Sequence, residues 1–140
     1  MTRTRTLLII EDDTDHRNVL RDVLEDAGFR VIAVGDAADA IPRTADAAID
    51  LILLDLVMPR ARMDGFAFLS EIRTRPDLAG TPLVILSGLG GAVAEAIDPA
   101  TAQALRIAAV IPKPFAIADL VRQIRQILGD LDDDVPEVAP

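Results

Sequence analysis

The feature of this sequence that most restricts its fold is a regular alternation of short apolar runs with segments of helical periodicity. Three of the apolar runs hold four consecutive aliphatic residues, which is typical of parallel strands covered on both faces. The expected strands are Leu7–Ile10, Arg30–Val34, Leu51–Leu54, Leu83–Leu86 and Ala109–Ile111. This alternation predicts an α/β fold, a doubly wound five-stranded parallel sheet flanked by about five helices.

The segments between the expected strands read as helices. The first carries an apolar stripe and stops at Gly28, and the last is strongly amphipathic. The middle ones are less regular, because prolines interrupt or end them. The expected helical segments are Asp15–Ala27, Asp36–Asp46, Phe66–Thr74, Val93–Ile107 and Ala116–Leu128.

The chain is long enough for one domain, which we place at residues 1–128. Its 140 residues are 51% hydrophobic, so a substantial core can be buried. From Gly129 to Pro140 the sequence is rich in aspartate and proline and has no apolar stripe. This segment is expected to be a disordered acidic tail or a linker.

Charge and composition exclude several classes of function. A net charge of −9 argues against direct nucleic-acid binding but suits divalent cations and basic protein partners. Without cysteine, neither disulfides nor thiol chemistry is available. The first apolar run, Leu7–Ile10, is too short for a secretory signal or a membrane span. We therefore expect a soluble, cytoplasmic protein with no membrane contact.

Polar side chains stand where the expected strands end. Glu11 and Asp12 follow the first strand, Asp55 follows the third, Ser87 follows the fourth, and Lys113 follows the fifth. In a doubly wound sheet, ligands bind outside the carboxyl ends of the strands, at the point where the strand order reverses. These side chains are therefore expected to converge at one edge of the sheet.

That set of groups suits phosphoryl chemistry. Clustered carboxylates raise one another's pKa values unless a cation neutralises them, and an oxygen-seeking cation such as Mg²⁺ would do so. One carboxylate could then attack a phosphoryl group and form an acyl phosphate. The metal, an ammonium and a hydroxyl would stabilise charge on the phosphoryl oxygens.

These residues and their order resemble the response regulator receiver domains of two-component signalling, which have a flavodoxin-like fold. The resemblance covers Thr6–Leu128, and all the motifs fall in order at strand ends. The motifs that carry it are Leu7–Asp13, Asp50–Pro59, Met63–Gly65, Pro82–Ser87 and Lys113–Phe115.

The resemblance implies a role for each site residue. Asp55 would accept a phosphoryl group from a histidine kinase or a histidine phosphotransfer protein. Mg²⁺ would lie on Asp12, Asp55 and the backbone carbonyl of Val57, with Glu11 contributing through water. Ser87 and Lys113 would contact the phosphoryl group, and the Lys113–Pro114 bond would be cis.

The resemblance also implies how such a chain works. It would catalyse only its own phosphorylation and dephosphorylation, as a monomer or weak dimer. It would signal to a downstream protein target through protein contacts.

Three residues in or beside the expected site are interpreted differently. Lys113 is the only lysine, against 13 arginines, which indicates a role that a compact point charge fills better than a planar guanidinium. Asp13 is interpreted as a helix-capping residue rather than a metal ligand. His16, the only histidine, is expected at the surface without a role.

The sequence departs from the receiver pattern in three places. The Arg60–Arg62 segment lengthens one loop by about two residues and could shape partner docking. The stretch from Ser87 to Lys113 is long and glycine-rich, which predicts a mobile segment. Val110 stands where the family often has an aromatic residue that couples phosphorylation to output. Signalling is therefore expected to move residues 88–108 instead.

Two alternatives remain on this sequence. One is a pseudo-receiver, an interaction module without phosphorylation, against which the complete acidic, hydroxyl and lysine set argues. The other is a phosphatase with aspartates at strand ends. Such enzymes place a second aspartate two residues after the first, and Val57 occupies that position. A P-loop motif is absent from the sequence.

Overall fold

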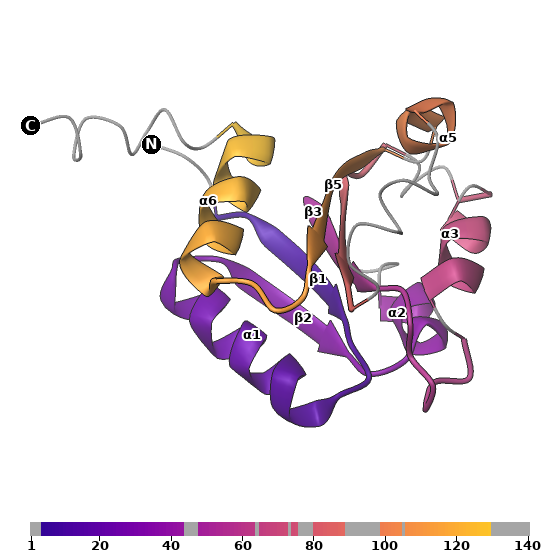
Figure 1. Ribbon diagram of the computed structural model, residues 1–140, viewed down its shortest axis with the longest axis horizontal. Coiled ribbons are helices and arrows are strands. Elements are labelled where there is room, and N and C mark those ends of the chain that lie inside the picture. The colour runs from indigo at the N-terminus through magenta and orange to yellow at the C-terminus, as the bar shows by residue number, and fades with distance from the viewer. Residues whose placement is uncertain are drawn as a thin grey trace, which may run out of the picture.

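In the computed structural model, the protein is a parallel five-stranded sheet between two layers of helices (Figure 1). The structure describes residues 4–43, 48–63, 65–72, 74–75, 80–88, 99–104 and 106–129. The sheet has the order β2-β1-β3-β4-β5, and every neighbouring pair is parallel. Its strands are β1 (Thr6–Ile10), β2 (Arg30–Val34), β3 (Leu51–Asp55), β4 (Leu83–Ser87) and β5 (Ile107–Pro112). The strand order therefore reverses between β1 and β3.

Helices cover both faces of the sheet. Those that the structure describes are α1 (Thr14–Asp26), α2 (Ala37–Arg43), α3 (Gly65–Ile72), α5 (Pro99–Ala104) and α6 (Ile117–Leu128). Helices α1 and α6 lie on one face, and α2 and α3 lie on the other (Figure 1).

A hydrophobic core lies on each face of the sheet, and successive residues of the central strands pack into the two cores alternately. In β1, Leu7 and Ile9 pack toward α1 and α6, whereas Leu8 and Ile10 pack toward α2 and α3. This period of two requires apolar residues at every position, because both faces of the strand are covered. The runs of four aliphatic residues are the direct consequence.

The predicted fold class is confirmed, with small differences in element bounds. Strand β5 begins at Ile107, two residues before the expected start, because pairing with β4 extends back to Leu83 across an irregular register. Helix α2 keeps Pro42 inside its last turn and ends at Arg43. Most of the segment predicted to move, residues 89–98, and the tail from residue 130 lie outside the described residues.

Two further expectations concerned Val110 and membrane-spanning segments. Val110 is partly buried and packs against the core beneath α2 and α3. No helix within the described ranges is both long and apolar enough to cross a membrane.

Strand register brings the candidate site together. Ile10 pairs with Leu54, so Glu11 and Asp55 follow on neighbouring strands. Asp55 pairs with Leu86, which places Ser87 one residue further along β4. The backbone N–H of Lys113 donates to the carbonyl oxygen of Ser87 at 2.8 Å, which fixes the end of β5 beside β4. All these groups share one edge of the sheet.

Gly65 allows α3 to start against the end of β3. Its N–H donates to the Leu56 carbonyl oxygen at 3.1 Å. A Cβ at this position would lie 2.5 Å from Leu56 Cα and 2.6 Å from the carbonyl oxygen of Asp55. Those atoms are backbone, so a side chain at position 65 would push against the strand that carries Asp55.

We therefore expect Gly65→Ala to destabilise the protein, with overpacking costing about 1–3 kcal/mol. The higher helix propensity of alanine, about 1 kcal/mol, offsets only part of this cost. Gly80→Ala is the matched control, because no atom lies within 4 Å of the added Cβ. Its free energy of unfolding, measured by urea denaturation, should change by less than about 0.5 kcal/mol. Equal effects of the two substitutions would contradict the close approach at Gly65.

Candidate functional site

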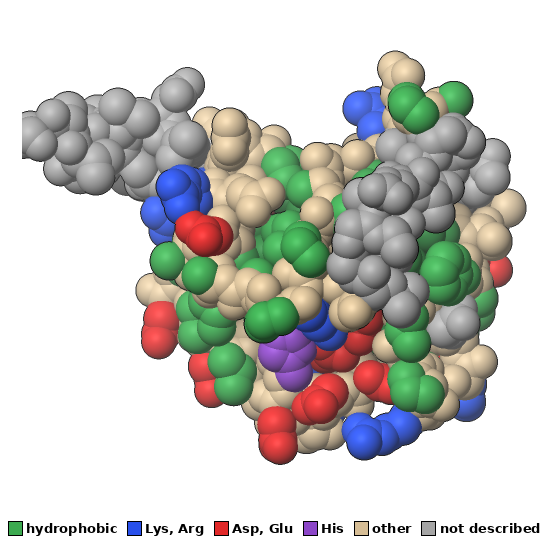
Figure 2. All heavy atoms as spheres, viewed as in Figure 1, with side chains coloured by type: hydrophobic (Ala, Val, Ile, Leu, Met, Phe, Trp, Pro, Cys, Tyr) green, Lys and Arg blue, Asp and Glu red, His purple; other side chains and the backbone are tan. Residues whose placement is uncertain are grey.

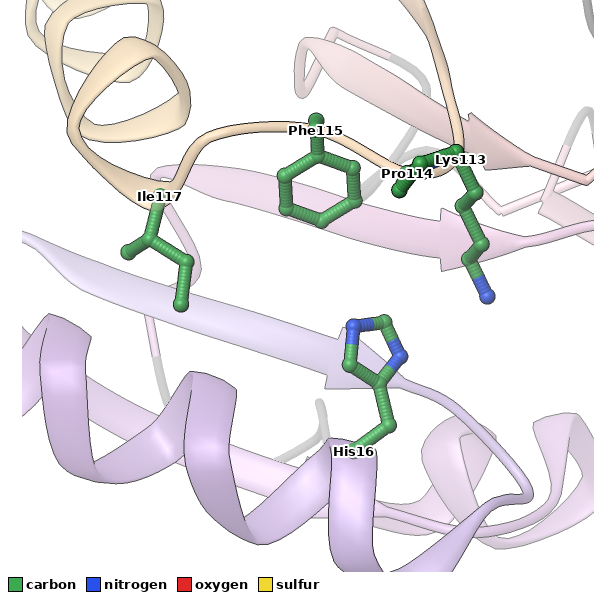
Figure 3. A pocket seen from close by; sticks show the side chains of 5 residues that line it. All are labelled: His16, Lys113, Pro114, Phe115 and Ile117. Carbon is green, nitrogen blue, oxygen red and sulfur yellow. The ribbon is translucent and has the colours of Figure 1, made fainter.

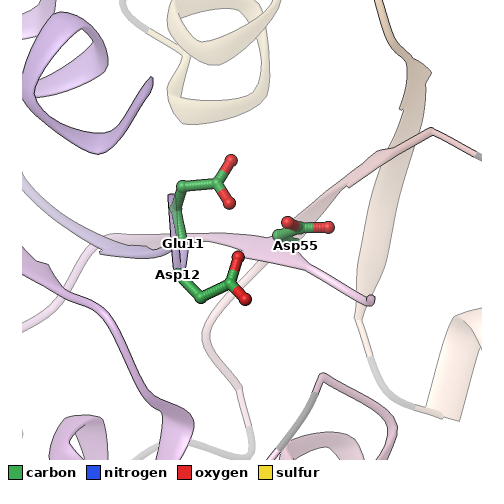
Figure 4. A group of neighbouring side chains, drawn as sticks. All are labelled: Glu11, Asp12 and Asp55. Atoms are coloured by element: carbon green, nitrogen blue, oxygen red, sulfur yellow. The ribbon is translucent and has the colours of Figure 1, made fainter. Parts of the chain in front are cut away.

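Three carboxylates meet at the point where the strand order reverses. Glu11 and Asp12 follow β1, and Asp55 ends β3. Each offers an oxygen within 4.8 Å of the others, and their side chains converge in Figure 4. Glu11 and Asp55 are buried, whereas Asp12 is half-buried. These three residues therefore lie close together, as the sequence predicted.

Lys113 is the cation that contacts two of these carboxylates. Its Nζ donates to Glu11 Oε1 at 3.0 Å and to Asp55 Oδ2 at 3.4 Å. Burial alone would lower the pKa of Lys113, but Glu11 and Asp55 outweigh it and raise that pKa. The ammonium is therefore charged at neutral pH.

One positive charge does not keep both buried carboxylates, Glu11 and Asp55, ionised at neutral pH and below. Burial, together with the neighbouring Glu11, raises the pKa of Asp55 to about 7, although Lys113 and the Val57 N–H act against this. Burial also disfavours ionised Glu11, but contacts with Asp55, Lys113 and His16 lower its pKa to about 2. In the absence of a metal, the pair therefore holds one proton, on Asp55, below neutral pH.

This shortage of positive charge fits a hard divalent cation. The donor set consists entirely of carboxylate oxygens, which is what Mg²⁺ prefers. A cation bound there would replace the shared proton and allow Asp55 to ionise. Glu11, Asp12 and Asp55 are the residues that could hold it. The Val57 carbonyl stays a prediction, and the Val57 N–H donates to Asp55 Oδ1 at 3.2 Å.

Ser87 and Asp13 occupy the places expected of them. Ser87 ends β4 and is buried, with 1% of its surface exposed. Asp13 caps α1, because its Oδ1 accepts the N–H of His16 at 3.0 Å. The Lys113–Pro114 bond is cis, as the resemblance implied.

His16 was predicted to be a surface residue outside the site; it does reach the surface, but it also contacts the site residue Glu11. It is half-buried, and its Nδ1 lies 2.5 Å from Glu11 Oε1. Its ring is tilted against that of Phe115, with 6.0 Å between the ring centres. The first turn of α1 folds back over the loop after β1, which brings a residue five positions after Glu11 beside it.

His16 also lines a groove next to the site. The other lining residues, labelled in Figure 3, are Lys113, Pro114, Phe115 and Ile117. On the molecular surface, acidic side chains gather around the histidine (Figure 2). The site therefore opens to solvent between α1 and the loop after β5.

Sequence reasoning missed two groups that hold Glu11 and Asp12, the acidic residues after β1, in place. Arg17 Nη1 donates to the carbonyl oxygen of Glu11 at 2.8 Å. It passes so close to Gly35 that a Cβ there would lie 2.7 Å from it. The backbone N–H of Arg60 donates to Asp12 Oδ2 at 3.1 Å. Arg60 lies 48 positions from Asp12, so no local pattern could have revealed this contact.

Comparisons with known proteins point to one family. A family model described as "Response regulator receiver domain" matches residues 7–125. The chain is 36% identical to "Response regulator receiver protein CpdR" of Brucella abortus (strain 2308), over 89% of this chain and 97% of that protein.

Two further comparisons extend this result. "Transcriptional regulatory protein CpxR" of Escherichia coli (strain K12) is 33% identical over 87% of this chain but only 48% of its own length. The chain thus spans about half of that relative. The solved receiver domain of NtrX from Brucella abortus has a TM-score of 0.73 at 28% identity and covers 88% of this chain and 98% of that one.

The raised pKa of Asp55 gives a pH prediction for the metal-free protein. Between the ordinary pKa of 3.8 and about 7, the folded state binds a proton that the unfolded state has lost. The free energy of unfolding should therefore fall as the pH rises from about 5 to about 8. Glu11 acts in the opposite sense, but only below its ordinary pKa of 4.5.

Asp55→Asn should remove most of this slope, because the amide is neutral throughout, and should stabilise the protein near pH 8. Asp22→Asn, exposed on α1, is the control and should keep the slope. Urea unfolding in the presence of a chelator measures both. A wild-type stability that rises across this range would contradict the shared proton.

Proposed function

The chain belongs to the response regulator receiver domain family, and we propose that Asp55 accepts a phosphoryl group from a histidine in a Mg²⁺-dependent reaction. The donor would be a histidine kinase or a histidine phosphotransfer protein. The observation that carries this proposal is the placement of Asp55. Its buried carboxylate lies beside two further acids and 3.4 Å from the only lysine of the chain.

The transfer is a displacement at phosphorus. A carboxylate oxygen of Asp55 forms the new P–O bond while the P–N bond to the donor imidazole breaks. The imidazole nitrogen keeps the electron pair of that bond and takes up a proton, and Asp55 becomes an acyl phosphate. Hydrolysis by water would later restore the carboxylate and release phosphate.

The surrounding groups would stabilise the charge in this transfer. Lys113 can move from Asp55 Oδ2 to a phosphoryl oxygen, because the acyl phosphate takes over the negative charge that Lys113 now contacts. Ser87, at the end of the neighbouring strand, would donate its hydroxyl proton to another. Glu11, Asp12, Asp55 and the Val57 carbonyl would hold Mg²⁺. The ion supplies charge neutralisation between the carboxylates and the incoming phosphoryl group.

Signalling would then pass through protein contacts. We propose that residues 1–128 are the phosphoaccepting domain of a cytoplasmic pathway and that residues 129–140 form a tail or linker. Relatives such as CpxR are transcriptional regulators by name and are about twice as long. The acidic charge of this chain favours a protein target over direct contact with nucleic acid.

The main competing function is a pseudo-receiver that binds partners without phosphorylation. Such a module has no need to bury two carboxylates beside a lysine, since unneutralised buried charges are costly. A phosphatase is a weaker candidate, because Val57 offers no carboxylate to act as a general acid.

Incubation of the full chain with acetyl phosphate and Mg²⁺ should add one phosphoryl group, seen by intact mass spectrometry. Asp55→Asn should abolish this addition, and so should a chelator, because both the nucleophile and its neutralising cation are required. Asp22→Asn should label like wild type. Labelling of Asp55→Asn at the wild-type rate would refute the site, and absence of labelling in wild type would favour the pseudo-receiver.

Lys113→Arg should slow the same reaction by roughly tenfold or more, although the charge is retained. A guanidinium is larger and planar, and it would pair with Glu11 and Asp55 together instead of following one phosphoryl oxygen. Arg122→Lys, on the exposed face of α6, is the reciprocal control and should label normally. A wild-type labelling rate in Lys113→Arg would show that the site needs only a positive charge.

A further inference from the structure

The loop between β3 and α3 reaches across to a candidate metal ligand. The backbone N–H of Arg60 donates to Asp12 Oδ2 at 3.1 Å. This contact occupies one oxygen of the carboxylate and leaves the lone pairs of the other for a cation. The orientation of Asp12 therefore depends on where the backbone at Arg60 stands.

Asp36, the residue just before α2, binds the other end of the same loop through hydrogen bonds. Asp36 Oδ2 accepts the N–H of Arg62 at 2.6 Å, and Oδ1 accepts the N–H of Met63 at 3.1 Å. Oδ1 also accepts the N–H of Ala38 at 2.9 Å, which caps α2. The N–H of Ala37 in turn donates to the Met63 carbonyl oxygen at 3.3 Å. One carboxylate thus joins the loop to the start of the helix.

Asp36 is well suited to hold a backbone in place. Its exposed fraction is 9%, so it cannot exchange these donors freely for water. Burial alone would raise the pKa of Asp36, but the N–H groups of Arg62, Ala38 and Met63 and the Arg62 guanidinium outweigh it and lower that pKa. Asp36 is therefore ionised near neutral pH, with charge-assisted hydrogen bonds on both oxygens.

The Arg62 side chain contributes less than its backbone does. Its side chain is 72% exposed, its Nε lies 3.4 Å from Asp36 Oδ2, and its Nη2 lies 2.8 Å from Asp39 Oδ1. Exposed ion pairs of this kind typically contribute little. The connection from Asp36 to the loop therefore runs chiefly through peptide groups.

We propose that Asp36 is a positioning residue for the magnesium site, which it serves by fixing the 60–63 loop so that the Arg60 N–H orients Asp12. This inference rests on the proposed function of the site. It also gives a use to the loop that is longer than the family pattern, since that loop supplies the Arg60 N–H.

The test is the dissociation constant of Mg²⁺ for the full chain, measured by titration calorimetry. Asp36→Asn keeps the shape of the side chain but replaces one acceptor oxygen with an NH₂ group. That group would face an N–H of the loop or of α2, so a hydrogen bond that holds the loop to the start of α2 should be lost. We expect Mg²⁺ binding to weaken by roughly tenfold, the size typical of groups that support metal ligands.

Two controls separate this effect from simpler ones. Asp39→Asn removes a carboxylate of the same charge three positions further along, in the first turn of α2. The Asp39 carboxylate accepts from the Arg62 guanidinium and not from the loop backbone among the described residues, so this variant reports the long-range loss of charge. Arg62→Ala removes the guanidinium and keeps the N–H. Both variants should bind Mg²⁺ within about twofold of wild type. Thermal melts of all three variants show whether each is folded at the temperature of titration.

The outcomes are distinct. If wild type binds Mg²⁺ and Asp36→Asn binds no more weakly than Asp39→Asn, Asp36 has no positioning role, while the proposed function stands. If wild type itself binds no Mg²⁺, the proposed function fails, and this inference fails with it. Weaker binding confined to Asp36→Asn supports the inference.

A measurement on wild type decides the matter if Asp36→Asn does not fold. Binding of Mg²⁺ to Asp12 and closure of the loop should be linked, so each favours the other. Saturation with Mg²⁺ should therefore slow hydrogen exchange at the N–H groups of Arg60, Arg62 and Met63, measured by NMR. Unchanged exchange at all three would overturn the inference.

Discussion

The structure depends on the burial of two carboxylates, Glu11 and Asp55, side by side where the strand order reverses. Four consecutive aliphatic residues precede each of them, because β1 and β3 are central strands covered on both faces. The apolar strands that build the core thus deliver charged groups to an edge with little water. Lys113 supplies one positive charge to this edge, and burial beside Glu11 still raises the pKa of Asp55. In the proposed function, a divalent cation would supply the remaining positive charge.

Groups outside the carboxylate set hold it in place. Arg17 reaches from α1 to the Glu11 carbonyl oxygen, and His16 contacts the Glu11 side chain. The Arg60 N–H orients Asp12, and the Lys113 N–H joins the ends of β4 and β5. Most of these contacts involve backbone atoms, so they fix where the chain runs and not only where a side chain points. A site that holds a metal and a phosphoryl group together, as we propose for this one, needs this precision.

The sequence was sufficient for the fold and for the convergence of the candidate site residues, because both follow from local patterns. Runs such as Leu51–Leu54 indicate buried parallel strands, and parallel strands place the residues after them at one edge. The contacts of His16, Arg60 and Asp36 could not be predicted in this way. They depend on how loops fold back in space, and the Arg60 contact uses a peptide N–H, which every residue except proline has. The Arg60–Arg62 segment was singled out from the sequence, but its connection to Asp12 required coordinates.

If Mg²⁺ binds as we propose, it replaces the proton that Asp55 carries in the metal-free protein. Titration calorimetry of Mg²⁺ binding near pH 6, in buffers with different ionisation enthalpies, counts the protons released per ion bound. Wild type should release close to one proton, because Asp55, with its pKa of about 7, must ionise when the cation binds. Asp55→Asn should release almost none. Proton release that is absent from wild type, or equal in the two proteins, would contradict the account.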